Sequence, residues 1–224
     1  MINYNVNELF ETIQGEGQYT GTPSLFLRLQ GCPVGCSWCD TKQTWETDKA
    51  DETDLQTILI KPADSPTWTA LTADQILGIF KNQGYTAKHV VITGGEPCMF
   101  DLVPLCELLH NHGYSTQIET SGTFVIKAPE TTWVTVSPKI NMKGGYEVLA
   151  SCMARANEIK HPVAREVHVE ELEALLAKSP INKNAFVYLQ PISQKPSATQ
   201  LAIDTCIKKN WRLSIQVHKY IGIS

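Results

Sequence analysis

Apolar and polar residues follow two rhythms along the chain, short β-branched runs and longer segments with helical spacing. Residues 89–93 form an apolar, β-branched run that ends at two glycines, which predicts a buried strand. Thr72, with Gln75 three residues on, makes a capping box before an apolar face, which predicts a helix that ends near Gly84. Asp101 is the predicted N-cap of a second helix.

The same alternation continues to the last residues. Repeated strand–helix units predict an α/β fold with a mostly parallel sheet and helices outside it. About six core strands are too few to close an eight-stranded barrel, so we predict an open, partial parallel β/α barrel. Further strands are predicted over 24–30, 115–119, 133–137, 158–160, 186–190 and 212–217, and further helices over 147–155, 170–178 and 198–209.

Polar residues gather where the predicted strands end. In parallel α/β folds, chemistry concentrates at the C-terminal ends of the strands. The segments found there are Thr93-Gly94-Gly95, Glu119-Thr120, Ser137-Pro138-Lys139 and Gln190-Pro191. One stretch, 42–71, breaks the rhythm with charged residues, threonines and prolines, together with Trp45 and Trp68. We predict one core domain over 1–224 with an insertion at 42–71.

Composition narrows the classes of protein. The 224 residues are 42% hydrophobic, enough for one substantial core. A net charge of -4 with mixed signs argues against a nucleic-acid surface. No apolar run reaches the roughly 18 residues that span a bilayer, and the first residues do not resemble a signal peptide. We expect a cytoplasmic protein without nucleic-acid or membrane partners, in which cysteines are ligands or core residues rather than disulfides.

The strongest chemical signal is the triplet Cys32, Cys36 and Cys39, spaced C-x3-C-x2-C directly after the first predicted strand. Pro33 and Gly35 help the loop to turn, so three thiolates can close around one metal site. An iron–sulfur cluster held by only three cysteines keeps one iron open for another ligand, which is a catalytic arrangement.

Other readings of the triplet stay open on spacing alone. A structural zinc site needs four ligands, and His89 or Cys98 could supply the fourth. Unligated buried cysteines are a third possibility. The four cysteines outside the triplet lie in helical or loop contexts, where apolar packing is the expected role: Cys98, Cys106, Cys152 and Cys206.

A second motif, Thr93-Gly94-Gly95-Glu96-Pro97, helps to interpret the triplet. A lone Gly-Gly-Glu-Pro is typical of a turn, but here it follows a predicted strand. Together the two motifs resemble the radical S-adenosylmethionine (SAM) superfamily, in which Trp38 also matches the usual aromatic residue before the third cysteine. The resemblance implies a [4Fe-4S] cluster on Cys32, Cys36 and Cys39, with the open iron chelated by the methionine moiety of SAM.

Further segments are similar to the 7-carboxy-7-deazaguanine synthase family: 8–17, Arg28, 39–41, 93–97, 119–122, 137–139, 157–160, 190–192 and 216–219. That resemblance implies a lyase of queuosine (7-deazapurine, tRNA modification) biosynthesis. It would contract 6-carboxy-5,6,7,8-tetrahydropterin to 7-carboxy-7-deazaguanine with loss of ammonia, using Mg2+ and a radical that SAM and the reduced cluster generate. A homodimer and an electron donor such as flavodoxin or ferredoxin are also implied. Glycyl-radical activases and a non-catalytic zinc module are the alternatives.

The resemblance also assigns residues, and Glu119 and His218 are the expected catalytic groups. The expected substrate contacts are Ile13, Gln14, Gly15, Arg28, Thr93, Glu119, His218 and Ser224. Arg28 is a charged planar fork that suits a carboxylate. By residue type alone, Arg28 is also compatible with a structural ion pair, and an isolated glutamate such as Glu119 is more often a salt-bridge partner. His218, on the predicted last strand, is compatible with a structural role, Gln14 with a turn and Ser224 with a loose tail.

A second set of residues is expected at the cofactors. Those implied for SAM are Trp38, Cys39, Asp40, Gly95, Ser137, Pro138, Lys139 and Gln190. Thr41 is the implied Mg2+ ligand, because magnesium prefers oxygen ligands and keeps several waters. Without the resemblance, Thr41 would be interpreted as a helix cap.

Overall fold

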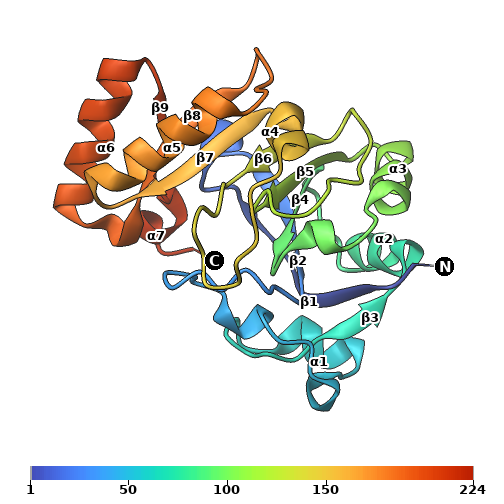
Figure 1. Ribbon diagram of the computed structural model, residues 1–224. Coiled ribbons are helices and arrows are strands. Elements are labelled where there is room, and N and C mark those ends of the chain that lie inside the picture. The colour runs from blue at the N-terminus through green and yellow to red at the C-terminus, as the bar shows by residue number, and fades with distance from the viewer. Residues whose placement is uncertain (1, 224) are drawn as a thin grey trace.

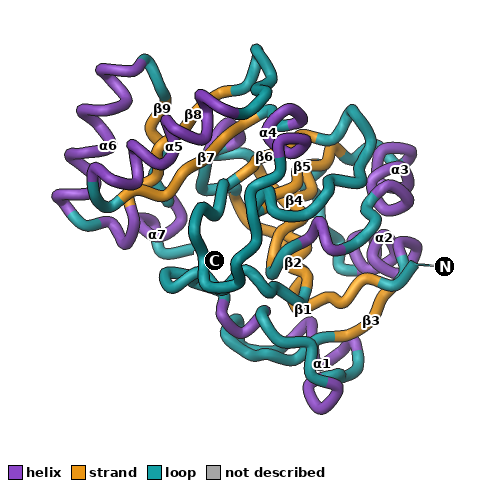
Figure 2. Tube along the Cα trace, in the orientation of Figure 1, coloured by secondary structure: helices purple, strands orange, loops and turns teal. Residues whose placement is uncertain are grey.

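The computed structural model describes residues 2–223 as one nine-stranded sheet with helices around it (Figures 1 and 2). The strand order is β3-β1-β2-β4-β5-β6-β7-β8-β9. All neighbours from β2 to β9 pair in parallel, whereas β1 is antiparallel to both β2 and β3. The sheet therefore ends at β3 and β9, and it does not close over the described residues. The predicted α/β fold with an open, mostly parallel sheet is confirmed.

The elements have the following bounds. The strands are β1 (Tyr4–Ile13), β2 (Pro23–Leu29), β3 (Thr69–Leu71), β4 (His89–Gly94), β5 (Ser115–Thr120), β6 (Trp133–Val136), β7 (Glu158–Val163), β8 (Phe186–Pro191) and β9 (Arg212–Leu213). The helices are α1 (Leu55–Ile60), α2 (Ala73–Asn82), α3 (Val103–Asn111), α4 (Ala150–Arg155), α5 (Glu166–Lys178), α6 (Pro196–Lys209) and α7 (Val217–Ile221). Within residues 2–223, none of these helices has the length and apolar character needed to cross a bilayer.

The apolar pattern missed β1, and its structure explains why. The register with β2 shifts between Val6 and Glu8, which is a β-bulge that breaks strict alternation. Asn7 and Glu8 are both buried there, and the Asn7 amide donates to the Gln30 side chain at 2.7 Å. Polar residues at buried positions hide a strand from a hydrophobic pattern.

Helix starts account for three differences from the predictions, and the capping box at Thr72 is confirmed. Helix α3 has Leu102, not Asp101, as its N-cap, although the Asp101 carboxylate accepts from the Val103 amide at 3.0 Å. Helix α4 begins at residue 150 rather than 147, because the extended Leu149 donates its amide to the Gly122 carbonyl. Helix α5 begins at 166 rather than 170; its first turn carries the exposed Val167, which weakens the apolar stripe.

The last predicted strand, 212–217, is wrong beyond its first two residues. Strand β9 covers only Arg212–Leu213, and the chain then turns into α7. His218 therefore lies on a short helix rather than on a strand. The Val217 amide bonds the Gly15 carbonyl at 3.0 Å, so the end of the chain docks on the connection after β1 instead of extending the sheet.

The core consists of two hydrophobic clusters, one packed on each half of the sheet in the strand order. One joins β1, β2, β4 and β5 to α2 and α3, and the other joins β6, β7 and β8 to α4, α5 and α6. Figure 1 shows these helix groups beside opposite halves of the sheet. Ile58 and Leu71 from the segment 42–71 belong to the first cluster, so this segment packs on the same core as β1. Cys98, Cys106, Cys152 and Cys206 are buried, as expected for packing residues.

Candidate active site

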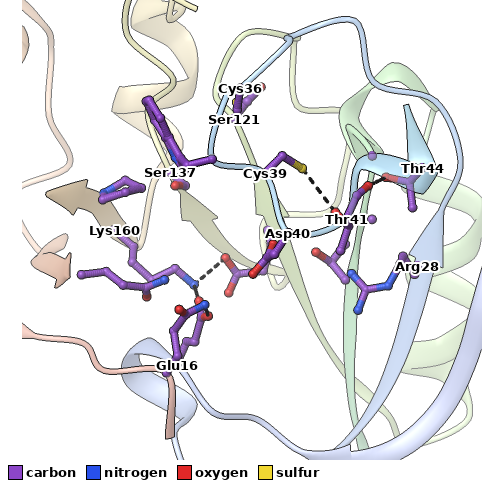
Figure 3. Close-up of a pocket in the computed structure, with 18 of the residues that line it drawn as sticks. Glu16, Arg28, Cys36, Cys39, Asp40, Thr41, Thr44, Ser121, Ser137 and Lys160 are labelled. Carbon is purple, nitrogen blue, oxygen red and sulfur yellow. Dashed lines mark hydrogen bonds and ion pairs between the residues drawn. The ribbon is translucent and has the colours of Figure 1, made fainter. Parts of the chain in front are cut away.

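The parallel strands open at their C-terminal ends into one cavity of about 480 Å³ (Figure 3). All four polar segments predicted at strand ends contribute to its wall. Among the expected site residues, two are not on this wall. Pro138 lines an adjacent cavity of about 210 Å³, which shares Trp38 with the first, and Ser224 lies outside the described residues. The expected residues that do line the large cavity are Ile13, Gln14, Gly15, Arg28, Cys32, Cys36, Trp38, Cys39, Asp40, Thr41, Thr93, Gly95, Glu119, Ser137, Lys139, Gln190 and His218.

The cysteine loop is tied to the segment that follows it. The Gly31 amide donates to the Thr44 carbonyl at 2.7 Å, and the Cys32 amide donates to the Trp45 carbonyl at 2.9 Å. The indole N–H of Trp45 then points back and donates to Cys39 Sγ at 3.4 Å. The insertion therefore begins as a support for the loop, with an N–H donor aimed at one of the three sulfurs.

The thiols of this loop are held in an environment that disfavours their charged form. Burial raises the pKa of Cys32 to about 11 and also raises that of Cys36, while the nearby Lys139 ammonium lowers the latter. Thiolate, not thiol, is the form that ligates a metal. A bound cationic group would offset the cost of burying these charges and would draw the protons off.

The donors around the cysteine loop discriminate between a zinc ion and an iron–sulfur cluster. No three His, Cys, Asp or Glu side chains in the described part of the chain converge on a single-ion site. The two residues considered as a fourth zinc ligand are engaged elsewhere. His89 bonds the side chains of Ser115 and Gln117 through its two ring nitrogens, and Cys98 is part of the core. Three thiols on one cavity wall fit a cluster that takes three cysteines and leaves one iron for an outside ligand.

The Gly-Gly-Glu-Pro segment crosses directly against the start of the cysteine loop. A Cβ on Gly95 would lie 2.1 Å from the Gly31 carbonyl oxygen, so only glycine fits there. The Glu96 amide donates to that same oxygen at 2.8 Å. The buried Glu96 carboxylate accepts from Thr120 Oγ1 at 2.6 Å and from the Ser121 amide at 2.8 Å. These contacts lock β4, β5 and the cysteine loop together.

Arg28 stands on β2 with its guanidinium against Glu8 of β1. Its Nε lies 2.6 Å from Glu8 Oε2, and the two side chains are only 17% and 12% exposed. Arg28 therefore does form an ion pair, with Glu8. Because the pair uses Nε, a carboxylate in the cavity could bind the remaining fork. Thr93 is the register partner of Arg28 across β2 and β4, which places a hydroxyl beside it.

Another part of the wall joins Glu119, an expected catalytic residue, to two charged residues to which the sequence analysis gave no role, Glu16 and Lys160. Lys160 Nζ lies 2.6 Å from Glu16 Oε2 and 2.9 Å from Glu119 Oε2. Burial raises the pKa of Glu119 to about 7, against the pull of Lys160. Burial acts upward on Glu16 too, but there Lys160 and a hydrogen bond from Gln216 outweigh it and lower the pKa to about 2. A lysine in a predicted buried strand was the available signal for this cluster.

The final helix brings His218 against the connection after β1. A Cβ on Gly15 would lie 2.3 Å from His218 Nδ1, so the imidazole packs on that glycine. Burial lowers the pKa of His218, while the Glu16 carboxylate raises it. Lys219 Nζ lies 3.1 Å from Asp40 Oδ2. The final helix and the connection after β1 thus meet at the cavity.

The remaining expected cofactor residues are also partly engaged with one another. Lys139 Nζ donates to Ser137 Oγ at 2.6 Å, and Gln190 accepts from Ser214 Oγ at 3.1 Å. Thr41 stands at the N-cap position of a short 3-10 helix but makes no side-chain capping bond. Its hydroxyl lies 3.6 Å from Cys39 Sγ, as Figure 3 shows.

Comparisons with known proteins agree with this geometry. The family model of the radical SAM superfamily matches residues 27–169. The chain is 56% identical to the 7-carboxy-7-deazaguanine synthase of Escherichia coli K12, with 100% of both chains covered. It is 48% identical to the same enzyme from Buchnera aphidicola (98% and 99% covered). The crystal structure of QueE from Escherichia coli superimposes with a TM-score of 0.94 at 56% identity, covering 96% of this chain and 95% of that one. The chain therefore belongs to the 7-carboxy-7-deazaguanine synthase family of radical SAM enzymes.

Proposed function

We propose that this chain contracts the ring of 6-carboxy-5,6,7,8-tetrahydropterin to 7-carboxy-7-deazaguanine with loss of ammonia. One observation carries the proposal: a single cavity holds the three thiols together with Arg28 and the charged cluster around Lys160. Figure 3 shows Cys36 and Cys39 at one end and Glu16 and Lys160 at another. A volume of about 480 Å³ is in the range of small-molecule sites, which favours a small substrate over a docked protein as in the activases.

Different sets of residues are proposed for the two cofactors. Cys32, Cys36 and Cys39 would hold the [4Fe-4S] cluster. The residues proposed for SAM are Trp38, Cys39, Asp40, Gly95, Ser137, Pro138, Lys139 and Gln190. When bound, these two groups supply the radical that starts the ring contraction. The protein contributes position and electrostatics: the backbone at Gly95 allows close approach, and Lys139 brings a positive charge near Cys36.

The part of the cavity around Arg28, Gln14 and Glu119 recognises the pterin by polar contacts. Arg28 binds the substrate carboxylate as a charged fork, with Glu8 holding its Nε. Gln14 and the backbone of residues 13–15 face the donor and acceptor edge of the ring, with Thr93 beside Arg28. Glu119 and His218 are the proposed catalytic groups. A carboxyl oxygen with a pKa of about 7 exchanges a proton near neutral pH, as the loss of ammonia requires.

Magnesium is assigned to Thr41. Its hydroxyl lines the cavity and makes no capping bond, so one hard oxygen is present. Mg2+ completes its shell with water and substrate oxygens when the protein supplies few ligands. Thr41 and the bound carboxylate of the substrate would then share one ion.

We further propose a cytoplasmic homodimer that takes electrons from a flavodoxin or ferredoxin. These finer assignments follow from family resemblance. We also propose that residues 1–224 form one core domain in which 42–71 is an integral insertion. Two observations support this: Ile58 and Leu71 pack in the core of β1 and β2, and β3 pairs with β1.

The decisive experiment is a complete assay under anaerobic conditions. Reconstituted protein is incubated with the carboxytetrahydropterin, SAM, Mg2+ and a reductant. We expect deazaguanine absorbance, one ammonia per product and no product without SAM. A protein that carries the cluster and cleaves SAM but leaves this pterin unchanged would overturn the substrate assignment. A colourless protein with zinc and no iron would overturn the radical reading altogether.

A further inference from the structure

Three charged side chains that line the cavity, Glu16, Glu119 and Lys160, meet at one point of its wall, and a fourth, Glu158, acts on Lys160 from outside the lining. Lys160 of β7 is 5% exposed, and its partners Glu16 and Glu119 are 17% and 15% exposed. A third carboxylate, Glu158, lies two residues before Lys160 on the same strand and is fully buried. These carboxylates come from the connection after β1, from β5 and from β7, and Lys160 is the cation that they share.

Each carboxylate is oriented by a second donor, which fixes the geometry. Gln117 donates to Glu119 Oε1 at 2.9 Å, and Gln216 donates to Glu16 Oε1 at 2.9 Å. Lys160 occupies the other oxygen of both. Glu158 accepts from the Gln18 amide through Oε2, and its Oε1 has no hydrogen-bond partner within the described residues. Glu16 and Glu119 therefore line the cavity with both oxygens of each carboxylate fixed by a donor.

The Lys160 ammonium alone bonds both Glu16 and Glu119, so these two carboxylates exceed the charge of the one cation that touches them. Excess buried charge is costly, and a protein relieves the cost by letting a carboxyl keep its proton. Burial raises the pKa of Glu119 and of Glu158, and both feel the other carboxylates as well as Lys160. At this point of the wall two carboxylates, Glu16 and Glu119, share one cation, Lys160, and this excess of acceptors complements a ligand that offers several N–H donors.

We propose that Lys160 is a positioning residue, which holds the Glu16 and Glu119 carboxylates on the substrate wall and controls whether Glu119 is ionised. The inference rests on the proposed function, because it takes the donor-rich pterin ring as the ligand. The control is electrostatic. The Lys160 ammonium favours the ionised form of Glu119, and the Glu16 carboxylate disfavours it.

Removing the cation and removing the neighbouring anion should shift the titration of Glu119 in opposite directions. Lys160→Met removes the cation, so Glu119 should titrate at higher pH. Glu16→Gln removes a competing anion, so Glu119 should titrate at lower pH. Each shift is expected to be about one pH unit, a roughly tenfold change in the ratio of the two forms. Lys160→Arg keeps the charge and should leave the titration near that of the parent protein.

Other charges near the cluster must be counted in the same experiment. His218 of α7 acts on Glu16, Lys219 beside it acts on His218, and Arg212 of β9 acts on Glu158. The variants leave all three in place, so their effect is common to every measurement. Lys88→Met is a matched control, since Lys88 is exposed over the Tyr114 ring and does not line the cavity.

The test is a pH titration of the reconstituted holoenzyme labelled with 13C at glutamate carboxyls, with Glu119→Gln used to assign the Glu119 signal. The pH dependence of kcat/KM is measured beside it, and the limb that belongs to Glu119 should move with the signal. Upward movement in Lys160→Met, downward movement in Glu16→Gln and none in Lys88→Met would support the proposal. A Glu119 signal that stays in place in Lys160→Met and in Glu16→Gln would overturn it.

The titration also separates this proposal from the proposed function. It reports on Glu119 even if the holoenzyme leaves the carboxytetrahydropterin unchanged, because the signal needs no turnover. Should Lys160→Met fail to fold, Glu16→Gln still decides the question by itself. A downward shift supports the electrostatic coupling, and an unchanged signal refutes it.

Discussion

The two ends of the cavity are built in different ways. The cysteine end comes from residues 31–45, a single stretch of chain closed by short-range backbone bonds such as that from Cys32 to Trp45. The lysine end comes from three separate parts of the sequence, the connection after β1, β5 and β7. Its bonds join Lys160 to Glu119 across two neighbouring strand pairs, and to Glu16 over a separation of 144 residues.

This difference determines what each end tolerates. A local loop keeps its own geometry as long as its turn residues and ligands are present. A charged cluster assembled from distant strands depends on the whole sheet, because each buried charge is costly unless its partners stand in place. The cysteine end should therefore fail by losing its cofactor, and the lysine end by losing binding or changing its pH response.

The largest effect is expected at the cysteine end. Cys32→Ala removes one of only three thiols, so the reconstituted protein should lose its cluster and form no 5′-deoxyadenosine. Iron and sulfide content and the absorbance of the cluster provide the measurement. Cys106→Ala is the control, since Cys106 is buried in α3 away from the cavity and should leave the cluster intact. A Cys32→Ala protein with full iron and sulfide would refute the ligand assignment.

A large but incomplete effect is expected at the substrate end. Arg28→Ala deletes a charged hydrogen-bonding group that is worth about 1.5–3 kcal/mol, so KM for the carboxytetrahydropterin should rise roughly 10- to 100-fold. SAM cleavage without the pterin should change little. Glu8→Gln loosens the arginine without removing its charge and should raise KM less. Equal KM values for Arg28→Ala and the parent would exclude Arg28 from the site.

The difference between local and long-range contacts also determines which parts of the fold the sequence predicts. Strands β2, β4, β6 and β8 were predictable because their sequences are largely apolar or β-branched. Strand β1 was not, since Asn7 and Glu8 are buried polar residues at a bulge. The tail was misread as a strand because Leu213 and Ile215 alternate with polar residues, whereas the bond from Val217 to Gly15 turns it into α7.

For the site, the sequence was enough to identify the residues of the motifs, but not the residues that orient them. Cys32, Cys36 and Cys39 stand close in sequence, so spacing alone points to a shared ligand. Lys160 and Glu16 acquire meaning only when the sheet brings β5, β7 and the connection after β1 together. No sequence interval encodes that contact, and the signals available were a lysine in a predicted strand and the family-like segments 8–17 and 157–160.

A moderate effect on stability should mark the contact between β4 and the cysteine loop. A methyl group on Gly95 would collide with the Gly31 backbone, so Gly95→Ala should cost about 1–3 kcal/mol in the free energy of unfolding. Gly78→Ala is its control, because Gly78 lies inside α2 with open space around it and should gain roughly 0.5–1 kcal/mol. Chemical denaturation measures both. Equal destabilisation by the two variants would contradict the close contact at Gly95.

The smallest effect should come from the bond between the insertion and the cluster end. The Trp45 indole N–H donates to Cys39 Sγ, and hydrogen bonds to ligand sulfurs help to set the reduction potential of an iron–sulfur cluster. Such a bond stabilises the more negative, reduced state. Trp45→Phe keeps the ring and removes the donor, so the reconstituted cluster should become harder to reduce, with a midpoint potential shifted to more negative values.

A redox titration followed by electron paramagnetic resonance measures that shift without turnover. Trp68→Phe is the matched control, because Trp68 lies in the same insertion but donates to the Asp48 carbonyl and does not line the cavity. A midpoint that moves in Trp45→Phe and stays in Trp68→Phe would make the insertion part of the cluster environment. If both variants keep the parent potential, the Trp45 N–H does not act on the cluster, and the insertion supports the cysteine loop through its backbone bonds alone.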